Sequence, residues 1–69
     1  MLLDHEKEFG VYHWDTFDDT TFLIGQYDRL PEAIKDVKVR YKGRLRADGA
    51  DQVQIVNKEG EVVKTFNVR

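Results

Sequence analysis

The stretch LPEAIKDVKVRYKG, residues 30–43, decides the fold, because its apolar residues recur at helical spacing with charged residues between them. These apolar residues are Leu30, Ala33, Ile34, Val37 and Tyr41. Pro31 suits the first turn of a helix, where its missing N–H is not needed, and Glu32 complements the helix dipole there. We therefore expect one helix over about residues 30–43.

The sequence leaves the end of this helix open. Lys42 followed by Gly43 is typical of a helix C-terminus. Leu45 continues the apolar stripe, however, so the helix could run on and end near Gly49. In that case Gly43 inside the helix would cost about 1 kcal/mol relative to alanine.

A pair of strand-like segments lies on each side of this helix. They are rich in aromatic and β-branched residues and are separated by turn-forming residues. The second pair is joined by Asn57-Lys58-Glu59-Gly60, which favours a type I turn with Gly60 in the left-handed region. We expect strands over about residues 9–15, 20–27, 51–57 and 61–68.

This order, ββαββ, predicts a single α+β domain over residues 9–69, preceded by a polar N-terminal lead over residues 1–8. The expected architecture is a four-stranded, mostly antiparallel sheet with one helix packed on one face. Strand order is left open, as is the face of the sheet that the helix covers.

Length and composition narrow the class of protein. A chain of 69 residues with 41% hydrophobic residues is one small globular domain, and the lack of cysteine excludes disulfides and thiolate-bound metals. Neither a signal peptide nor a stretch long enough to span a membrane is visible, so we expect a cytoplasmic protein without a membrane partner. Residues 1–33 hold eight acidic residues against two basic ones, whereas residues 34–69 hold nine basic against five acidic.

Part of the chain is similar to a known group of domains. Ala33-Ile34 early in the helix, the strand DQVQIV and the turn Lys58-Glu59-Gly60-Glu61-Val62 resemble small bacterial ββαββ domains of unknown function. The resemblance covers roughly residues 9–68, and His13-Trp14-Asp15 has no counterpart in it. It implies the fold and a bacterial origin, and it implies no activity.

One helix can cover only one face of the sheet, yet the first strand pair is apolar on both faces. Strict alternation places Tyr12, Trp14, Leu23 and Tyr27 together on one face. Tyrosine and tryptophan are enriched at the centres of protein interfaces, so we predict an interaction surface here. The partner would be a second copy, bound through this face or a sheet edge, or another protein. The alternative is that the N-terminal lead, or the chain after Gly43, folds over these residues.

A second hypothesis concerns the basic stretch KDVKVRYKGRLR, residues 35–46, which has six basic residues and one acidic one. With the strand aromatics it could bind nucleic acid weakly, by contacting phosphates and stacking bases. The isoelectric point of about 5.6 favours the simpler interpretation of a solvated helix face. The residues in question are Lys35, Lys38, Arg40, Lys42, Arg44 and Arg46.

Catalysis is the third and least favoured hypothesis. The chain has no serine or cysteine, which removes the two commonest nucleophiles. His13 and Asp15 share a strand face, and Asp18 or Asp19 could fold back to complete a metal or acid–base site. Their spacing matches no known metal-binding loop, so the simpler interpretation is a half-buried histidine paired with a carboxylate. We therefore expect a non-enzymatic protein-interaction or accessory module with no cofactor, no metal and no catalytic residue.

Overall fold

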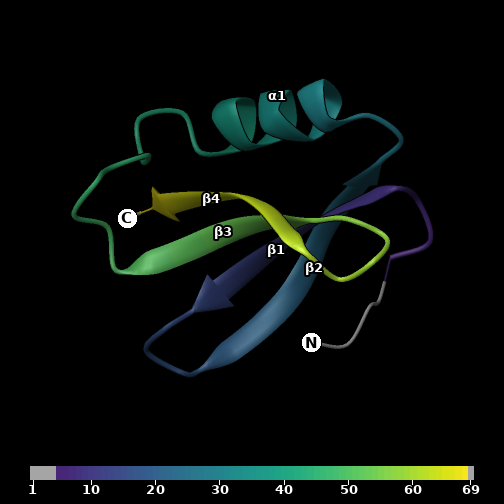
Figure 1. Ribbon diagram of the computed structural model, residues 1–69. Coiled ribbons are helices and arrows are strands. Elements are labelled where there is room, and N and C mark those ends of the chain that lie inside the picture. The colour runs from purple at the N-terminus through teal and green to yellow at the C-terminus, as the bar shows by residue number, and fades with distance from the viewer. Residues whose placement is uncertain (1–4, 69) are drawn as a thin grey trace.

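The computed structural model describes residues 5–68 and has the element order ββαββ (Figure 1). The strands are β1 (Phe9–Asp15), β2 (Thr20–Tyr27), β3 (Asp51–Val56) and β4 (Val62–Val68), and the helix is α1 (Leu30–Arg40). The first two strands have the expected bounds. The last two are each one residue shorter than expected, because Asn57 and Glu61 belong to the turn between them.

The four strands form one open sheet in the order β2-β1-β3-β4, and every neighbouring pair is antiparallel. The α+β fold expected from the sequence is therefore confirmed. Both hairpins pair internally, and β1 and β3 then join the hairpins side by side at the centre of the sheet. This order leaves β2 and β4 as the two edge strands.

Helix α1 ends earlier than the sequence indicated, at Arg40. Tyr41 caps it, with its backbone N–H donating to the Val37 carbonyl at 2.9 Å. The chain then turns through Gly43, whose φ of 79° lies in the left-handed region that glycine adopts without strain. Of the two ends that the sequence left open, the structure is closer to the one at Gly43.

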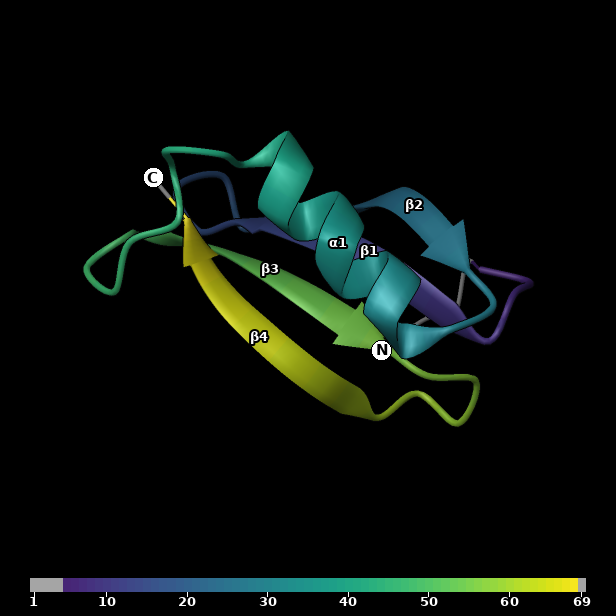
Figure 2. The same ribbon diagram turned by 90° about the horizontal axis from the view of Figure 1, so that it is seen from above.

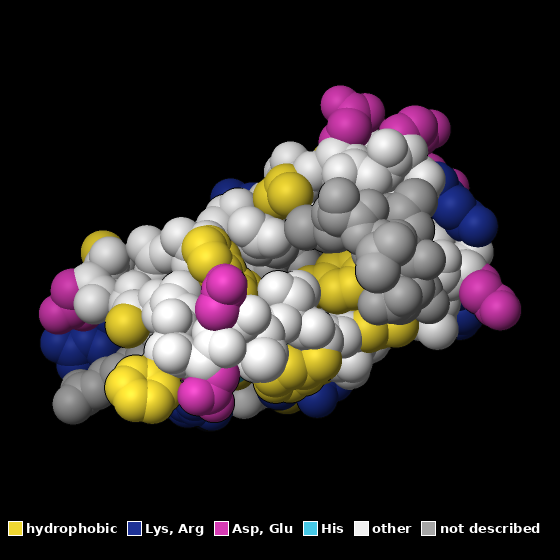
Figure 3. All heavy atoms as spheres, turned by 90° about the horizontal axis from the view of Figure 1, so that it is seen from below, with side chains coloured by type: hydrophobic (Ala, Val, Ile, Leu, Met, Phe, Trp, Pro, Cys, Tyr) yellow, Lys and Arg dark blue, Asp and Glu magenta, His cyan; other side chains and the backbone are white. Residues whose placement is uncertain are grey.

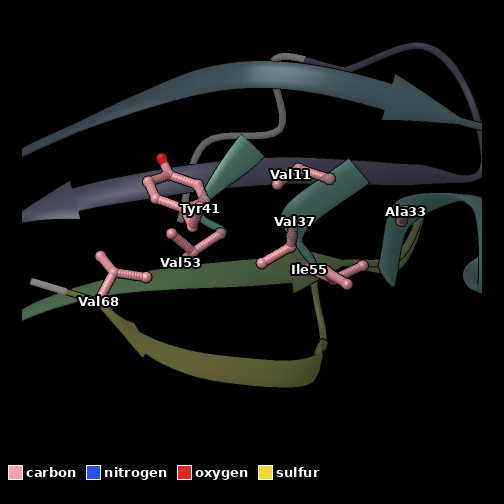
Figure 4. Close-up of a cluster of buried hydrophobic side chains, with 7 residues drawn as sticks. All are labelled: Val11, Ala33, Val37, Tyr41, Val53, Ile55 and Val68. Carbon is pink, nitrogen blue, oxygen red and sulfur yellow. The ribbon is translucent and has the colours of Figure 1, made fainter. Parts of the chain in front are cut away.

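The hydrophobic core lies between α1 and one face of the sheet (Figures 2 and 4). The helix packs over β1, β2 and β3 and contributes Ala33 and Val37, both fully buried. On the sheet side of the core lie apolar residues of β1, β3 and β4. Tyr41 lies at one end of the cluster, directly after the helix. The buried sheet residues of this cluster are Val11, Val53, Ile55 and Val68.

An irregularity in the edge strand β2 changes which of its residues share a face. In β2 the register jumps so that Val11 pairs with Gly25 and Tyr12 pairs with Leu23, leaving Ile24 as an extra residue. Residues after this bulge lie on the opposite face from the one that strict alternation assigns. Tyr27 consequently lies on the helix side, packed against the core, and its expected place beside Leu23 was wrong.

The polar lead is partly folded against the sheet, on the face that α1 does not cover; residues 1–4 lie outside the described residues. The His5 ring is 6% exposed, and its Nδ1 lies 2.7 Å from the Tyr12 hydroxyl. The side-chain carbonyl of Gln26 accepts hydrogen bonds from the backbone N–H groups of Glu6 and Lys7. This part of the lead therefore covers one end of the sheet face opposite α1. Such a cover by the lead is the alternative to an exposed interaction surface that the sequence left open.

Gly10 provides the space for this contact, because a Cβ placed on it would lie 2.5 Å from His5 Nδ1. We predict that Gly10→Ala displaces His5 from Tyr12, while the helix-side core stays intact. The atoms in the way belong to side chains, so the cost in the free energy of unfolding is below the ~1–3 kcal/mol typical of overpacked cores. NMR of the His5 ring and chemical denaturation measure the two effects. An unmoved His5 ring would contradict the prediction, and His5→Ala serves as the reference for a released lead.

Candidate interaction surface

The face of the sheet opposite α1 is built entirely of uncharged residues. Residues directly opposite each other in antiparallel strands share a face, so the pairing partners of Gly10, Tyr12 and Trp14 define it. None of these positions holds Asp, Glu, Lys or Arg, although 35% of the chain is charged. The residues of this uncharged face are Gly10, Tyr12, Trp14, Thr21, Leu23, Gln26, Gln52, Gln54, Val56, Val62, Thr65 and Asn67.

Figure 3 views the molecule from this side and shows Lys and Arg side chains only toward its margins. The hydrophobic side chains lie in several separate groups rather than in one continuous patch, and Asp or Glu side chains lie between some of them (Figure 3). At the border of the face, the Trp14 indole N–H donates to the Asp19 carboxylate of the first hairpin loop at 3.2 Å. This bond fixes the orientation of the indole.

The structure brings together only part of the interaction surface expected from the sequence. Trp14 and Leu23 are half-buried and lie on the uncharged face. Tyr12 lies between them and the lead but is only 2% exposed, and Tyr27 lies on the other side of the sheet. The residues that sequence reasoning missed are the amides of β3, Gln52 and Gln54, whose alternation with Val53 and Ile55 is the signal that could have identified them.

His13 lies on the helix side, where both of its ring nitrogens have partners. Nε2 is 3.2 Å from the Asp51 carboxylate, and Nδ1 is 2.6 Å from the hydroxyl of Tyr41. An ionised carboxylate can only accept, so Nε2–H donates to Asp51, while Nδ1 forms a hydrogen bond with the Tyr41 hydroxyl. The ring also stacks on Phe22, with centroids 5.3 Å apart and planes 5° apart.

His13 is a strand histidine paired with a carboxylate, as the simpler interpretation expected, but it is buried rather than half-buried, and the carboxylate comes from β3. Asp15 instead accepts hydrogen bonds from the backbone of its own loop, at Phe17 and Asp18. Within residues 5–68 no group of three or more His, Cys, Asp or Glu residues could hold a metal ion. His13 therefore links the first hairpin to the end of α1 and the start of β3 and has no ring nitrogen left for a ligand.

The basic residues of the second hypothesis lie on α1 and on the loop that follows it, whereas Tyr12 and Trp14 lie on the opposite face of the sheet. Several of them already have partners: Arg40 pairs with Asp36 at 3.2 Å, and Arg46 pairs with Asp48 at 3.2 Å. The Arg44 guanidinium lies 5.3 Å from the centre of the Tyr41 ring. The basic residues therefore lie away from Tyr12 and Trp14, and nucleic-acid binding stays an untested hypothesis.

A hollow of about 370 Å³ lies between the end of β2 and the outer side of α1. Its lining residues are Tyr27, Glu32, Lys35, Asp36 and Val39. Burial, and next the neighbouring Asp36 carboxylate, raise the pKa of the Tyr27 phenol, so this side chain stays neutral. Val39 is 68% exposed at the rim, so the hollow, which we call the edge hollow, is apolar in part and open to solvent.

Comparisons with protein-family models, with curated proteins and with solved structures give no match to this chain. None of the helices in the described range is long and apolar enough to cross a membrane.

The hydrogen bond from His13 lowers the pKa of the Asp51 carboxyl below its usual 3.8, with further hydrogen bonds from Thr16. A carboxyl whose pKa is lower in the folded than in the unfolded state stabilises the fold above its unfolded pKa, and this contribution is lost as the pH falls through the folded value. We predict that Asp51→Asn is less stable than the wild type at pH 7, and that the difference shrinks below pH 3.8. Urea denaturation at a series of pH values tests this; a difference that is constant with pH would contradict it.

Proposed function

We propose that this chain is a small, non-enzymatic protein-interaction module that binds another protein through the uncharged face of its sheet. The observation that carries the proposal is the absence of charge from every position of that face, in a chain of which 35% is charged. The centres of protein interfaces are depleted in charged residues and enriched in aromatic ones. The face fits this description, with Trp14 and Leu23 half-buried among amides.

The chemistry of the face suits reversible binding. Burying a charge at an interface is costly unless it is paired, whereas amides and hydroxyls can exchange water for hydrogen bonds with a partner at small net cost. Gln52, Gln54 and Thr65 would supply such hydrogen bonds around the apolar surface of Trp14 and Leu23. The expected partner surface is likewise uncharged, with apolar side chains opposite Trp14.

The size of the face sets the expected affinity. Four strands of about seven residues, spaced ~4.8 Å apart, span on the order of 400 Å². Gly10, Tyr12 and Val56 at one end are buried, so the part that is open to a partner is smaller. A typical stable interface buries about 800 Å² on each partner, so one copy of this face alone would bind at the weak, transient end of the range.

We predict that a lysine at the centre of the face weakens binding by about tenfold or more, because its charge must be buried without a partner. Gln54→Lys is the test, since Gln54 lies on a central strand, away from both edges. Glu59→Gln, in the turn before β4, is the matched control because it changes the net charge by the same amount.

The measurement is affinity capture from extracts of the cells that make the protein, with wild type, variant and control in parallel. Each captured protein is then titrated against the chain with fluorescence of Trp14, its single tryptophan, as the signal. We expect to find proteins that the wild type and the control retain and that Gln54→Lys does not retain. These proteins should shift the Trp14 emission when they bind. The same proteins retained equally by all three forms would overturn it.

A further inference from the structure

Strand β2 is an edge strand that lacks charge and proline, two of the usual protections against pairing, although it carries a bulge at Ile24. Its sequence, TTFLIGQY, contains no charged residue and no proline, the features with which proteins commonly keep an edge from pairing. The other edge strand, β4, carries Lys64, and its end is paired with the chain after α1, where the Arg46 N–H donates to the Asn67 carbonyl at 3.1 Å. Among the described residues, β2 is therefore the more open edge.

The two ends of β2 have complementary shapes on the helix side of the sheet. Near its start, the Phe22 ring projects with half of its surface exposed, held flat against His13. Near its end lies the edge hollow, beside Tyr27 and Val39. The edge hollow has a volume of about 370 Å³ and is open to solvent, so it is a surface recess against which an aromatic ring can lie.

We propose that a second copy of this chain docks on β2 in antiparallel orientation, so that Phe22 of each copy enters the edge hollow of the other. A two-fold axis perpendicular to the sheet exchanges the ends of the two β2 strands, which is the operation that brings a projection at one end to a hollow at the other. The contact is thus made twice by one symmetric arrangement. No charged side chain of β2 meets its own copy, because β2 has none.

The bulge at Ile24 limits the backbone part of this contact. A bulge disrupts the regular spacing of the edge N–H and C=O groups, so only short stretches on either side of it can form ladder hydrogen bonds. Specificity then depends mainly on the two Phe22 side chains, and the dimer is weak enough to require high concentration.

This arrangement has a consequence that rests on the proposed function. A two-fold axis perpendicular to the sheet keeps both helices on one side and both uncharged faces on the other. The joined faces together span less than about 800 Å² of open surface, because one end of each face is buried. Pairing at β2 would still double the surface open to a partner and bring it closer to the size of a typical stable interface.

Sedimentation equilibrium from 10 µM to about 1 mM tests the pairing with the full chain. We expect association that Phe22→Glu weakens by about tenfold or more, because it replaces the phenyl ring by a carboxylate that must lose water in a hollow lined by charges of both signs, Glu32, Lys35 and Asp36. Val39→Lys, at an exposed helix position that does not endanger folding, should weaken association through loss of the apolar rim. The double variant should regain part of the association, since the carboxylate introduced in one copy would meet the ammonium group introduced in the other.

Two controls separate the possible outcomes. Val63→Glu places the same charge at an exposed apolar position on the opposite edge strand and should leave association unchanged, as should Gln54→Lys on the uncharged face. Amide exchange should show protection of β2 that increases with concentration. A wild type that stays monomeric at 1 mM, or equal weakening by Phe22→Glu and Val63→Glu, would overturn the pairing. Neither result bears on Gln54→Lys in partner capture, which tests the uncharged face separately.

Discussion

The structure depends on one constraint: a four-stranded sheet has two faces, and this chain has a single helix to cover them. Helix α1 spans 11 residues, about 16 Å, and packs over three strands on one side. The helix side can therefore be a conventional aliphatic core, whereas the other side needs a different solution. Here the lead covers Tyr12 with His5 at one end, and amides and hydroxyls surround Trp14 and Leu23 over the rest.

The features that the sequence predicted well are those with local causes. The bounds of β1 and β2, the start of α1 at Leu30 and the turn at Gly60 follow from composition, spacing and turn chemistry within a few residues. The face of Tyr27 could not be predicted this way. One extra residue, Ile24, reverses the alternation after it, and the neighbouring Gly25, a residue that often marks a bulge inside a strand, indicates an irregularity without fixing the register. The helix end was misjudged because Tyr41 continues the apolar stripe as a cap rather than as a helical residue.

The candidate sites show the same division between local and distant causes. His13 was correctly interpreted as a paired strand histidine, but its partners, Tyr41 and Asp51, lie 28 and 38 residues further along the chain. No spacing rule connects residues so far apart; only the β1–β3 pairing and the position of the helix end bring them together. The aspartates nearest to His13 in the sequence are not its hydrogen-bond partners, because they have other partners. Asp15 and Asp19 are occupied by the loop backbone and by the Trp14 indole.

The distribution of charge connects the fold to the proposed role. A sheet face exposed only to water gains solubility from charged side chains, and placing them there costs nothing when the face has no other task. Among the described residues, charged side chains lie on the helix, the loops, the lead and the helix side of the sheet, and none belongs to the sheet positions of the uncharged face. Glutamine, threonine and asparagine keep that face wetted without the desolvation penalty that a charge imposes when a partner arrives. A face of this composition is compatible both with a free monomer and with a bound complex. The edge strand β2 also has no charged residue, so the uncharged surface extends to that edge of the sheet.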